Sequence, residues 1–323
     1  MKVIDCPRYG PPGVVRIIDK PIPSLGPDQV LVRVVVSTVT TADARVRALD
    51  MPSPTFSAIG RIALGLRGPR ARVLGTELAG IVHAVSPGVS SLAVGERVVA
   101  TPSGWFGAHA EYVALKATRV VRVPGRLTCE EAVALPFGAC TALYFLDKLA
   151  RIREGQRLLI LGGTGSVGTA AVQIAAHRGA IVHATARPKH AALVRSLGAH
   201  HTIDHTSANP LDTADRFDVI LDTRGITNFA AARPAMTPTG VFLPVVATMR
   251  EFRQAFITCR GRVRTGMASD STDVLQHVMD LAAADVLKPV IGARFTMDQI
   301  AEAYALVDSG RKLGTAILRI GED

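Results

Sequence analysis

Apolar and polar positions follow two different patterns along this chain. In the first part, short apolar segments are separated by Pro and Gly, which is typical of β-strands joined by turns. The strands expected there are 30–36, 80–85, 96–100 and 110–113. Short strands at this spacing favour a small β-barrel. The intervening segment 51–73 is less regular and basic, and is expected to be a mobile loop or a short helix near a substrate cleft.

The pattern changes near Leu127, where predicted helices begin to alternate with predicted strands. The helices are expected at 130–134, 141–149, 191–197, 228–235 and 274–284, and the strands at 181–185, 219–222, 240–246, 289–291 and 316–320. Such alternation builds a parallel sheet with helices on both faces. We expect the last of these elements, from 274–284 to 316–320, to return to the β domain built by the first part of the chain. The chain is therefore predicted to be α/β, with one domain at 1–125 completed by 269–323 and a second at 126–268.

The most specific motif is a glycine-rich turn after the apolar strand at 158–161. Gly163, Gly165 and Gly168 stand at G-x-G-x-x-G spacing, and a helix follows them. The first glycine is expected to permit the tight turn, the second to let backbone approach phosphate, and the third to let the helix pack on the strand. At the helix start, at Ser166 and Val167, the motif predicts a dinucleotide pyrophosphate on backbone N–H groups.

The strand after this motif indicates which dinucleotide binds. It ends at Thr185 and is followed by Arg187 and Lys189, and no acidic residue occurs from 155 to 203. A site for NAD normally has an acid there for the ribose 2′-OH, whereas two cations suit a 2′-phosphate. The alternative is that both cations merely solvate a helix start, where cations are disfavoured unless an anion is present. We therefore expect NADPH.

Composition excludes several classes of protein. Hydrophobic residues make up 48% and charged residues 20%, as in an ordinary soluble α/β protein. No apolar run is expected to span a bilayer, the N-terminus carries no signal-peptide pattern, and the four cysteines show no paired spacing. These features predict a cytoplasmic protein with free thiols and no membrane partner.

The formal net charge is +10, and five arginines crowd one segment. They are Arg250, Arg253, Arg260, Arg262 and Arg264. A basic surface can bind nucleic acid or attract a phosphorylated cofactor. Because few aromatic residues accompany the arginines, a solvated basic face or a subunit edge is the favoured interpretation, and a nucleic-acid partner is not expected.

Several segments, in order along nearly the whole chain, resemble the medium-chain dehydrogenase/reductase superfamily in its zinc-free quinone oxidoreductase branch. They are 9–12, 30–34, 74–80, 94–98, 107–113, 134–136, 141–143, the glycine turn and 309–314. The resemblance implies a GroES-like catalytic barrel and a Rossmann domain with doubly wound parallel sheet, with the active site between them. It also implies a homodimer joined through the edge of the Rossmann sheet.

The resemblance predicts an enzyme without zinc. The positions of the zinc ligands in zinc-dependent members are occupied here by Val39 or Thr40, Thr76 and Phe137, which are poor ligands. Without a Lewis acid, hydride addition to a quinone or an α,β-unsaturated carbonyl compound fits better than alcohol oxidation. The expected activity is therefore an NADPH-dependent quinone or enone oxidoreductase acting on a small molecule.

Further site residues follow from the resemblance. Thr40 and Arg45 stand where the family places an Asn and a Tyr at the nicotinamide, so both are catalytic candidates. The alternatives are that Thr40 caps a helix and that Arg45 faces water, the second being favoured. Thr141 matches a position under the nicotinamide, or is an N-cap. His205 could stack on the adenine end or be a surface histidine.

The remaining candidates follow from strand ends and from the returning segment. Thr223 and Val245–Val246 end strands at the carboxyl edge of the sheet, where ligands bind in such folds. Lys312 could reach the cofactor or face solvent, and Trp105 could form part of an apolar rim or of the packing. Two alternatives to the predicted function remain. One is an acyl-chain enoyl reductase, and the other is a weakly catalytic NADPH-binding or nucleic-acid-associated protein.

Overall fold

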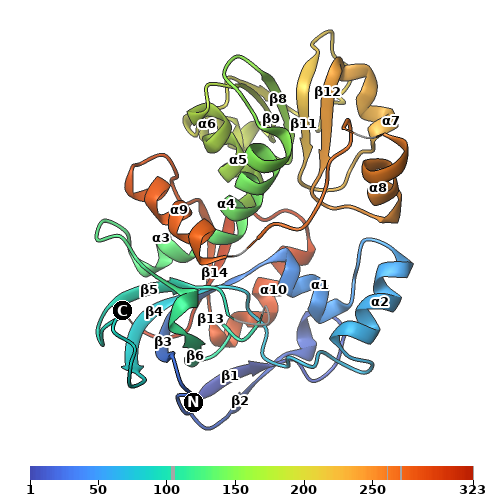
Figure 1. Cartoon of the computed structure of the whole chain (residues 1–323). Helices are drawn as coiled ribbons and strands as arrows, with labels where there is room; N and C mark the ends of the chain where they lie inside the picture. Colours follow the sequence, from blue (N-terminus) through green and yellow to red (C-terminus); the bar gives the residue numbers. More distant parts are fainter. Residues whose placement is uncertain (103–105, 260, 270, 323) are drawn as a thin grey trace. The chain divides into compact units, whose positions relative to one another are not determined.

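The computed structural model describes residues 1–102, 106–259, 261–269 and 271–322, and contacts divide the chain into two units (Figure 1). Unit 1 comprises Met1–Pro136, Asp270–Ala283 and Ile291–Asp323, and unit 2 comprises Phe137–Ser269 and Ala284–Val290. The chain therefore passes between the units four times. The domain boundaries expected at residues 126 and 269 stay predictions.

The strands of unit 1 form a two-stranded and a seven-stranded sheet. The smaller sheet pairs β1 (Lys2–Asp5) with β2 (Arg16–Asp19). The larger contains β3 (Gln29–Val39), β4 (Leu78–Val85), β5 (Arg97–Ala100), β6 (Tyr112–Lys116), β7 (Val120–Arg122), β13 (Ile291–Thr296) and β14 (Thr315–Arg319). β13 and β14 thus return from the end of the chain to the sheet that its first part builds.

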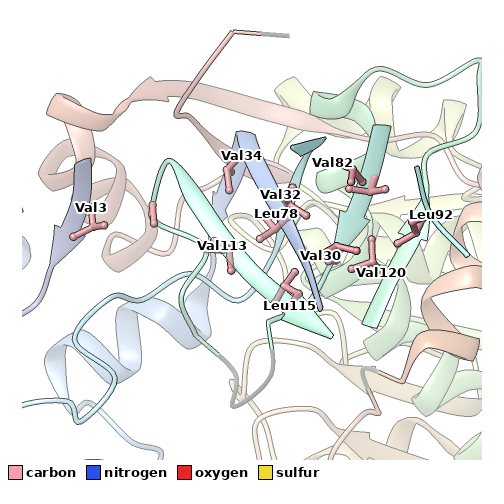
Figure 2. Packing of buried hydrophobic residues seen from close by; sticks show 14 residues of the cluster. Val3, Val30, Val32, Val34, Leu78, Val82, Leu92, Val113, Leu115 and Val120 are labelled. Carbon is pink, nitrogen blue, oxygen red and sulfur yellow. The ribbon is translucent and has the colours of Figure 1, made fainter. Parts of the chain in front are cut away.

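The long strand β3 organises this sheet, because it pairs with β4, β6 and β14 along its eleven residues. Its apolar run is buried almost throughout, as expected for a strand covered on both faces. Register shifts in its pairing with β4 mark bulges, which bend a strand and increase its twist. Figure 2 shows Val30, Val32 and Val34 packed with Leu78 and Val113 in one apolar cluster.

Five α-helices are described in unit 1, together with short 3-10 turns. They are α1 (Thr41–Ala48), α2 (Pro54–Leu64), α3 (Cys129–Val133), α9 (Thr272–Ala283) and α10 (Ile300–Asp308), and the turns are η1 (Pro12–Val14), η2 (Ala117–Arg119) and η6 (Met297–Gln299). The segment 51–73 therefore contains a helix, one of its two expected forms. Ser53 caps that helix through Phe56 N–H, and Pro54 occupies its first turn.

Unit 2 is a five-stranded parallel sheet in the order β10-β9-β8-β11-β12. The strands are β8 (Arg157–Leu161), β9 (Ile181–Thr185), β10 (His201–Ile203), β11 (Phe217–Asp222) and β12 (Met236–Pro244). Sequential strands run outward in opposite directions from β8, so the order reverses between β8 and β11. In open α/β sheets, ligands bind at the carboxyl ends of the strands at such a point.

Helices cover both faces of this sheet (Figure 1). They are α4 (Pro136–Leu143), α5 (Ser166–His177), α6 (Pro188–Ser196), α7 (Phe229–Ala232) and α8 (Met249–Arg253), with η3 (Tyr144–Ala150), η4 (Arg233–Ala235) and η5 (Gln254–Thr258). Leu159 and Ile220 cluster with Ala232 of α7 on one face. Because side chains alternate along a strand, Leu158 and Ile160 point to the other face, and both are fully buried.

One helical stretch among the described residues, Cys129–Ala150, is long and apolar enough to cross a membrane by length and composition alone. The expectation that no apolar run reaches this length is therefore wrong. Pro136 starts α4 and Gly138 lies within it, so neither residue ends the helical stretch. The structure buries 67% of the apolar window, as a core helix of a soluble protein would be.

Candidate functional site

The glycine turn lies at the carboxyl end of β8. The backbone has positive φ at Gly162 (+92°), so the residue that needs left-handed freedom is Gly162 rather than Gly163. The turn is tied to the neighbouring strand, because Gly162 N–H donates to Thr185 Oγ1 (2.8 Å) and Gly163 N–H to Thr185 O (3.1 Å). Thr185 therefore supports the turn through its own side chain.

The three glycines of the motif differ in the space around them. A Cβ at Gly163 would lie 2.9 Å from Ala184 Cβ, and one at Gly168 would lie 2.0 Å from Gly162 O. A Cβ at Gly165 would meet only Gly162 O, at 3.8 Å. Gly163 and Gly168 are thus required by packing, whereas Gly165 faces open space at the start of α5. That space suits the predicted approach of a phosphate to the backbone.

The start of α5 has no acidic residue in its first turn and no side-chain cap, which is typical of a helix start that binds an anion. Ser166 and Val167 form this first turn. Helix α4 lies against it, since a Cβ at Gly138 would be 2.3 Å from Ser166 O.

Thr141 does not lie at a helix start, which corrects the N-cap alternative. It stands within α4, and its hydroxyl donates to Phe137 O (2.7 Å), the bond back to the preceding turn that threonine makes inside helices. Its predicted place under the nicotinamide stays a prediction.

The end of β9 carries the two predicted cations. Arg187 is the N-cap of α6 and Lys189 follows Pro188 in its first turn, and both side chains are exposed. The first turn contains no acidic residue. His190 lies nearby, and its pKa is lowered by partial burial and by the charges of Lys189 and Arg187. Positive charge is thus concentrated at a helix N-terminus, where it is unfavourable without an anion.

His205 lies next to this edge. Ile203 of β10 pairs with Thr185, and His205 follows two residues later in a turn. Its ring is partly buried, and Nδ1 has no hydrogen-bond partner among the described residues. His205 is therefore near the ribose end of the predicted site, while its contact with adenine stays a prediction.

The end of β11 is held by a buried aspartate. Asp222 Oδ1 accepts hydrogen bonds from Arg224 N–H (2.9 Å) and Gly225 N–H (2.8 Å), and Oδ2 accepts one from Thr227 N–H (2.9 Å). Burial raises the pKa of Asp222, and these backbone donors oppose the shift. The sequence identified this strand end, but not the role of Asp222 in shaping its loop.

Thr223, Val245 and Val246 line the same edge. The Thr223 hydroxyl donates to Leu161 O (2.8 Å), so it ties β11 to the strand that precedes the glycine turn. Val245 N–H donates to Asp222 O (2.9 Å), and Val246 lies against Gly225. The structure thus places these three residues beside the turn, and their contacts with a cofactor stay predictions.

In unit 1, Thr40 caps α1, which is the alternative role considered for it. Its hydroxyl donates to Asp43 Oδ2 (2.6 Å), and Asp43 N–H donates back to it (3.2 Å). The Thr40 and Thr76 hydroxyl oxygens are 3.4 Å apart. Because the Thr40 proton is already donated to Asp43, Thr76 is the donor in that contact. The Thr40 hydroxyl thus uses its proton on Asp43 and its two lone pairs on Asp43 N–H and Thr76, and its catalytic role stays a prediction.

Asp43 joins this helix to a distant loop. It is fully buried, and its Oδ1 accepts from Gly75 N–H (3.0 Å) while its Oδ2 accepts from Thr40 N–H (2.8 Å). Gly75 has φ +95°, and a Cβ there would lie 2.6 Å from His109 Cδ2. Thr40 and Asp43 stand at the spacing of a capping box, a local signal that could have identified Asp43, whereas nothing local connects His109 with either residue.

His109 is a buried neutral histidine. Burial lowers its pKa, and the Asp43 charge opposes the shift. Its Nε2 lies 2.9 Å from Thr38 O, which can only accept, so Nε2 carries the proton. Nδ1 is then a buried acceptor, without a partner among the described residues. Tyr304 packs edge-on against the ring.

The two arginines of α1, Arg45 and Arg47, are both at least partly buried. Arg45 is partly buried, and burial lowers its pKa, so the interpretation that it simply faces water is wrong. Arg47 is almost fully buried: it pairs with Asp308 (2.6 Å), donates to Gly10 O, and stacks over the Tyr304 ring. Arg47 therefore ties α1 to α10. Whether Arg45 acts in catalysis stays a prediction.

Lys312 is partly buried, which corrects its solvent-facing alternative. Its ammonium donates to Gly314 O (2.5 Å). Burial lowers its pKa to about 8, and the Glu77 charge opposes the shift. The carboxylate of Glu77 in turn accepts from the Thr38 hydroxyl (2.6 Å). The pKa of Lys312 is thus far below that of an exposed lysine in the folded state, and its contact with the cofactor stays a prediction.

This shift predicts a measurable pH dependence of stability. In the unfolded chain Lys312 titrates near 10.5, so between pH 8 and 10.5 the unfolded state binds more protons and the free energy of unfolding rises with pH. The expected gain is about 1–3 kcal/mol relative to a Lys312→Met variant. Urea unfolding of both proteins across this range checks it. Parallel stability curves for the two would contradict it.

The remaining site residues are those at the positions of the zinc ligands of zinc-dependent members, and Trp105 of the expected apolar rim. Thr40 and Thr76 lie together in unit 1, and Phe137 belongs to unit 2. No group of three or more His, Cys, Asp or Glu side chains that could hold a metal is found among the described residues. Trp105 lies outside the described residues.

The basic segment is partly engaged in packing. Arg262 donates to Gly240 O (3.1 Å) and Thr237 O (3.0 Å), and Arg264 donates to Leu149 O (2.5 Å). Arg260 lies outside the described residues. The Arg262 side chain therefore holds this segment against β12, and the Arg264 side chain holds it against η3.

Comparison with known proteins agrees with this architecture. A family model for the alcohol dehydrogenase GroES-like domain matches residues 26–125, and one described as zinc-binding dehydrogenase matches 197–318. The structure of the quinone oxidoreductase from Coxiella burnetii superposes with a TM-score of 0.86 at 23% identity, covering 99% of each chain. The predicted fold, a GroES-like domain and a Rossmann domain, is confirmed.

Three curated relatives illustrate the sequence similarity. The 2-methylene-furan-3-one reductase of Solanum lycopersicum is 28% identical over 98% of this chain and 79% of its own length. The chloroplastic NADPH-dependent alkenal/one oxidoreductase of Arabidopsis thaliana is 28% identical over 92% and 73%. A polyketide synthase of Streptomyces halstedii is 35% identical over 77% of this chain but only 4% of its own length.

The GroES-like and dehydrogenase models match successive parts of the chain, the full-length relatives are reductases, and the glycine turn stands at the switch point of a parallel sheet. This chain belongs to the medium-chain dehydrogenase/reductase superfamily.

Proposed function

We propose that this protein is an NADPH-dependent, zinc-independent oxidoreductase that reduces a quinone or an α,β-unsaturated carbonyl compound. The observation that carries the proposal is the cationic, acid-free end of β9 beside the glycine turn. When bound, NADPH supplies the hydride from C4 of its nicotinamide. The names of the Solanum and Arabidopsis relatives support this substrate class.

The residues present fit this cofactor. The turn offers open space at Gly165, and α5 starts there without an acidic residue or a side-chain cap, which suits a pyrophosphate. Arg187 and Lys189 are exposed where the ribose of the adenosine half would lie, and no acid stands there to repel a 2′-phosphate. These features favour NADPH over NADH.

Replacing both cations by alanine tests the cofactor preference. The Arg187→Ala/Lys189→Ala protein is expected to bind NADPH about 100-fold more weakly, because each charge-assisted hydrogen bond contributes roughly 1.5–3 kcal/mol. NADH, which lacks the 2′-phosphate, should bind about equally to both proteins. Fluorescence titration of the reduced cofactors measures both affinities. An equal loss for the two cofactors would show that the cations do not read the 2′-phosphate.

Zinc independence is supported by the side chains at the predicted ligand positions. The Thr40 proton is donated to Asp43, and Thr76 provides only a hydroxyl. A substrate with a conjugated carbonyl delocalises the developing charge, so hydrogen bonds suffice to stabilise it. We infer that solvent delivers the proton, because Thr40 and Arg45 occupy the positions where the resembled family has an Asn and a Tyr.

One experiment tests both the proposed substrate class and the proposed independence from zinc. Purified protein, treated with a chelator and freed of metal, is mixed with NADPH and a panel of quinones and enones. Loss of the reduced-cofactor absorbance is expected with part of the panel and should not change when zinc is added. Absence of turnover with every compound, or restoration of turnover by zinc, would contradict the proposal.

An acyl-chain enoyl reductase is the second candidate, favoured by the match to a polyketide synthase. The two functions differ in the rate profile across substrates. A steady rise in kcat/KM with acyl-chain length on thioesters, together with little activity on quinones, would favour the enoyl reductase.

We also propose that the protein is a homodimer joined through the segment 249–267, which follows β12 in unit 2. This segment contains four large apolar side chains that are each more than half exposed: Met249, Phe256, Ile257 and Met267. Several large apolar side chains exposed in one segment are typical of an interaction surface. No nucleic-acid partner is proposed, since Arg262 and Arg264 bind backbone carbonyls.

Replacing Ile257 by aspartate is expected to shift the protein from dimer to monomer, because a charge would then be buried in the interface. Light scattering coupled to gel filtration measures the mass. The matched control is Ile226→Asp, since Ile226 is similarly exposed in another loop of unit 2. A wild-type mass of about 34 kDa would overturn the dimer.

A further inference from the structure

Arg224 lies on the glycine turn, and its guanidinium makes no contact with the described part of the chain that would explain it as a structural residue. It follows Thr223 at the end of β11, and its stem covers Gly162: a Cβ added there would lie 2.8 Å from Arg224 Cγ and 3.1 Å from Cδ. The residue is exposed, and its guanidinium makes no hydrogen bond or ion pair among the described residues. The structure therefore holds an unpaired cation above the first residue of the turn.

The backbone beneath this cation is fixed. Arg224 N–H and Gly225 N–H both donate to Asp222, which is fully buried. Gly225 adopts a positive φ of 69° and packs against Val246. The loop can thus neither swing away nor offer a carboxylate to the guanidinium, since Asp222 is occupied by backbone donors. A cation held in this way lowers the electrostatic potential energy of an anion bound at the turn.

The turn connects Arg224 to the predicted ribose end of the site. Gly162, which the Arg224 stem covers, donates to the Thr185 hydroxyl at the end of β9. Arg187 follows Thr185 by two residues. Arg224 and the Arg187–Lys189 pair therefore follow the two strands, β11 and β9, that flank β8 and its glycine turn. The pyrophosphate, by contrast, is served by backbone N–H groups at the start of α5.

We propose that Arg224 is a specificity-determining residue that binds the 2′-phosphate of NADPH, opposite Arg187 and Lys189. This inference rests on the proposed function and deepens it. The planar guanidinium can donate two parallel hydrogen bonds to one phosphate, which an ammonium cannot do. A phosphate held by cations from both flanking strands is discriminated more strongly from a ribose hydroxyl than one held from β9 alone.

The test compares Arg224→Met with Arg224→Lys and a charge-matched control. Methionine keeps an unbranched stem over Gly162 and removes the guanidinium. Arg216→Met removes the same charge at the opposite, amino end of β11, where Arg216 donates to the carbonyls of residues 213–215. Isothermal titration measures binding of NADPH, NADH, adenosine 2′,5′-bisphosphate and 5′-AMP, and thermal unfolding verifies that each variant folds.

Arg224→Met is expected to weaken NADPH and the 2′,5′-bisphosphate by about 10- to 100-fold, while NADH and 5′-AMP bind as in the wild type. Arg224→Lys should retain part of the affinity, and Arg216→Met all of it. Unchanged NADPH binding, or an equal loss for NADPH and NADH, would overturn the proposal. If the wild type itself does not prefer NADPH, the proposed function fails. Failure of Arg224 alone leaves that preference intact.

Discussion

Replacing Gly168 by alanine is expected to cost about 4 kcal/mol of stability and to abolish measurable NADPH binding. The added Cβ would lie 2.0 Å from Gly162 O and 2.8 Å from Gly163 Cα. Both contacts are with backbone, so no flexible side chain can move aside. Either α5 must move away from β8, or the turn must open. The first change loosens the buried face of α5, and the second removes the N–H groups that a phosphate needs.

Urea unfolding measures the stability, and quenching or enhancement of NADPH fluorescence measures binding. Gly165→Ala is the matched control within the same motif, since its Cβ would meet nothing closer than 3.8 Å. We expect it to change stability by less than about 1 kcal/mol and to weaken NADPH at least roughly tenfold, because the methyl group would project toward the phosphate. A Gly168→Ala protein of normal stability would contradict the packing, and unaffected binding by Gly165→Ala would contradict the phosphate position.

The glycine turn could be predicted from the sequence because all the residues that define it are neighbours in the chain. A strand, three glycines at fixed spacing and a helix are adjacent in the chain, so their geometry follows from short-range constraints. What the spacing did not show is which glycine bends the backbone. The positive φ is at Gly162, whose conformation depends on Thr185 in the next strand and on the Arg224 stem. Contacts of this kind arise only when the sheet forms.

Unit 1 illustrates the opposite case. Thr38 and Asp43 stand five residues apart, but Gly75 and His109 come from two distant segments, and no spacing in the sequence connects these two with the first pair. Their burial is set by how β3 pairs with its neighbours and by where α1 begins. The resemblance to a family drew attention to Thr40 and Arg45, whereas the hydrogen bonds center on Asp43 between them. A buried polar network is therefore invisible to pattern analysis when its members are distant in the chain.

Asp43→Ala is expected to destabilise the protein by about 3–5 kcal/mol. The substitution removes the acceptor for Thr40 N–H, the Thr40 hydroxyl and Gly75 N–H, all of which are buried. Each buried donor left without a partner costs roughly 1–3 kcal/mol. Asp43→Asn should recover part of the loss, since its amide oxygen can still accept one of these bonds. Urea unfolding monitored by circular dichroism measures the three stabilities.

A second capping box in unit 1 provides a control that separates the contribution of burial to stability from that of helix capping. Thr128 and Glu131 make the same reciprocal bonds at the start of α3, but at the surface and without a third donor from another segment. Glu131→Ala should therefore cost only about 1 kcal/mol, because water can satisfy the freed N–H groups. If Asp43→Ala cost no more than Glu131→Ala, Asp43 would be an ordinary helix cap. A larger cost makes it the link that holds Gly75 and the α1 start together, and with them the position of Thr40.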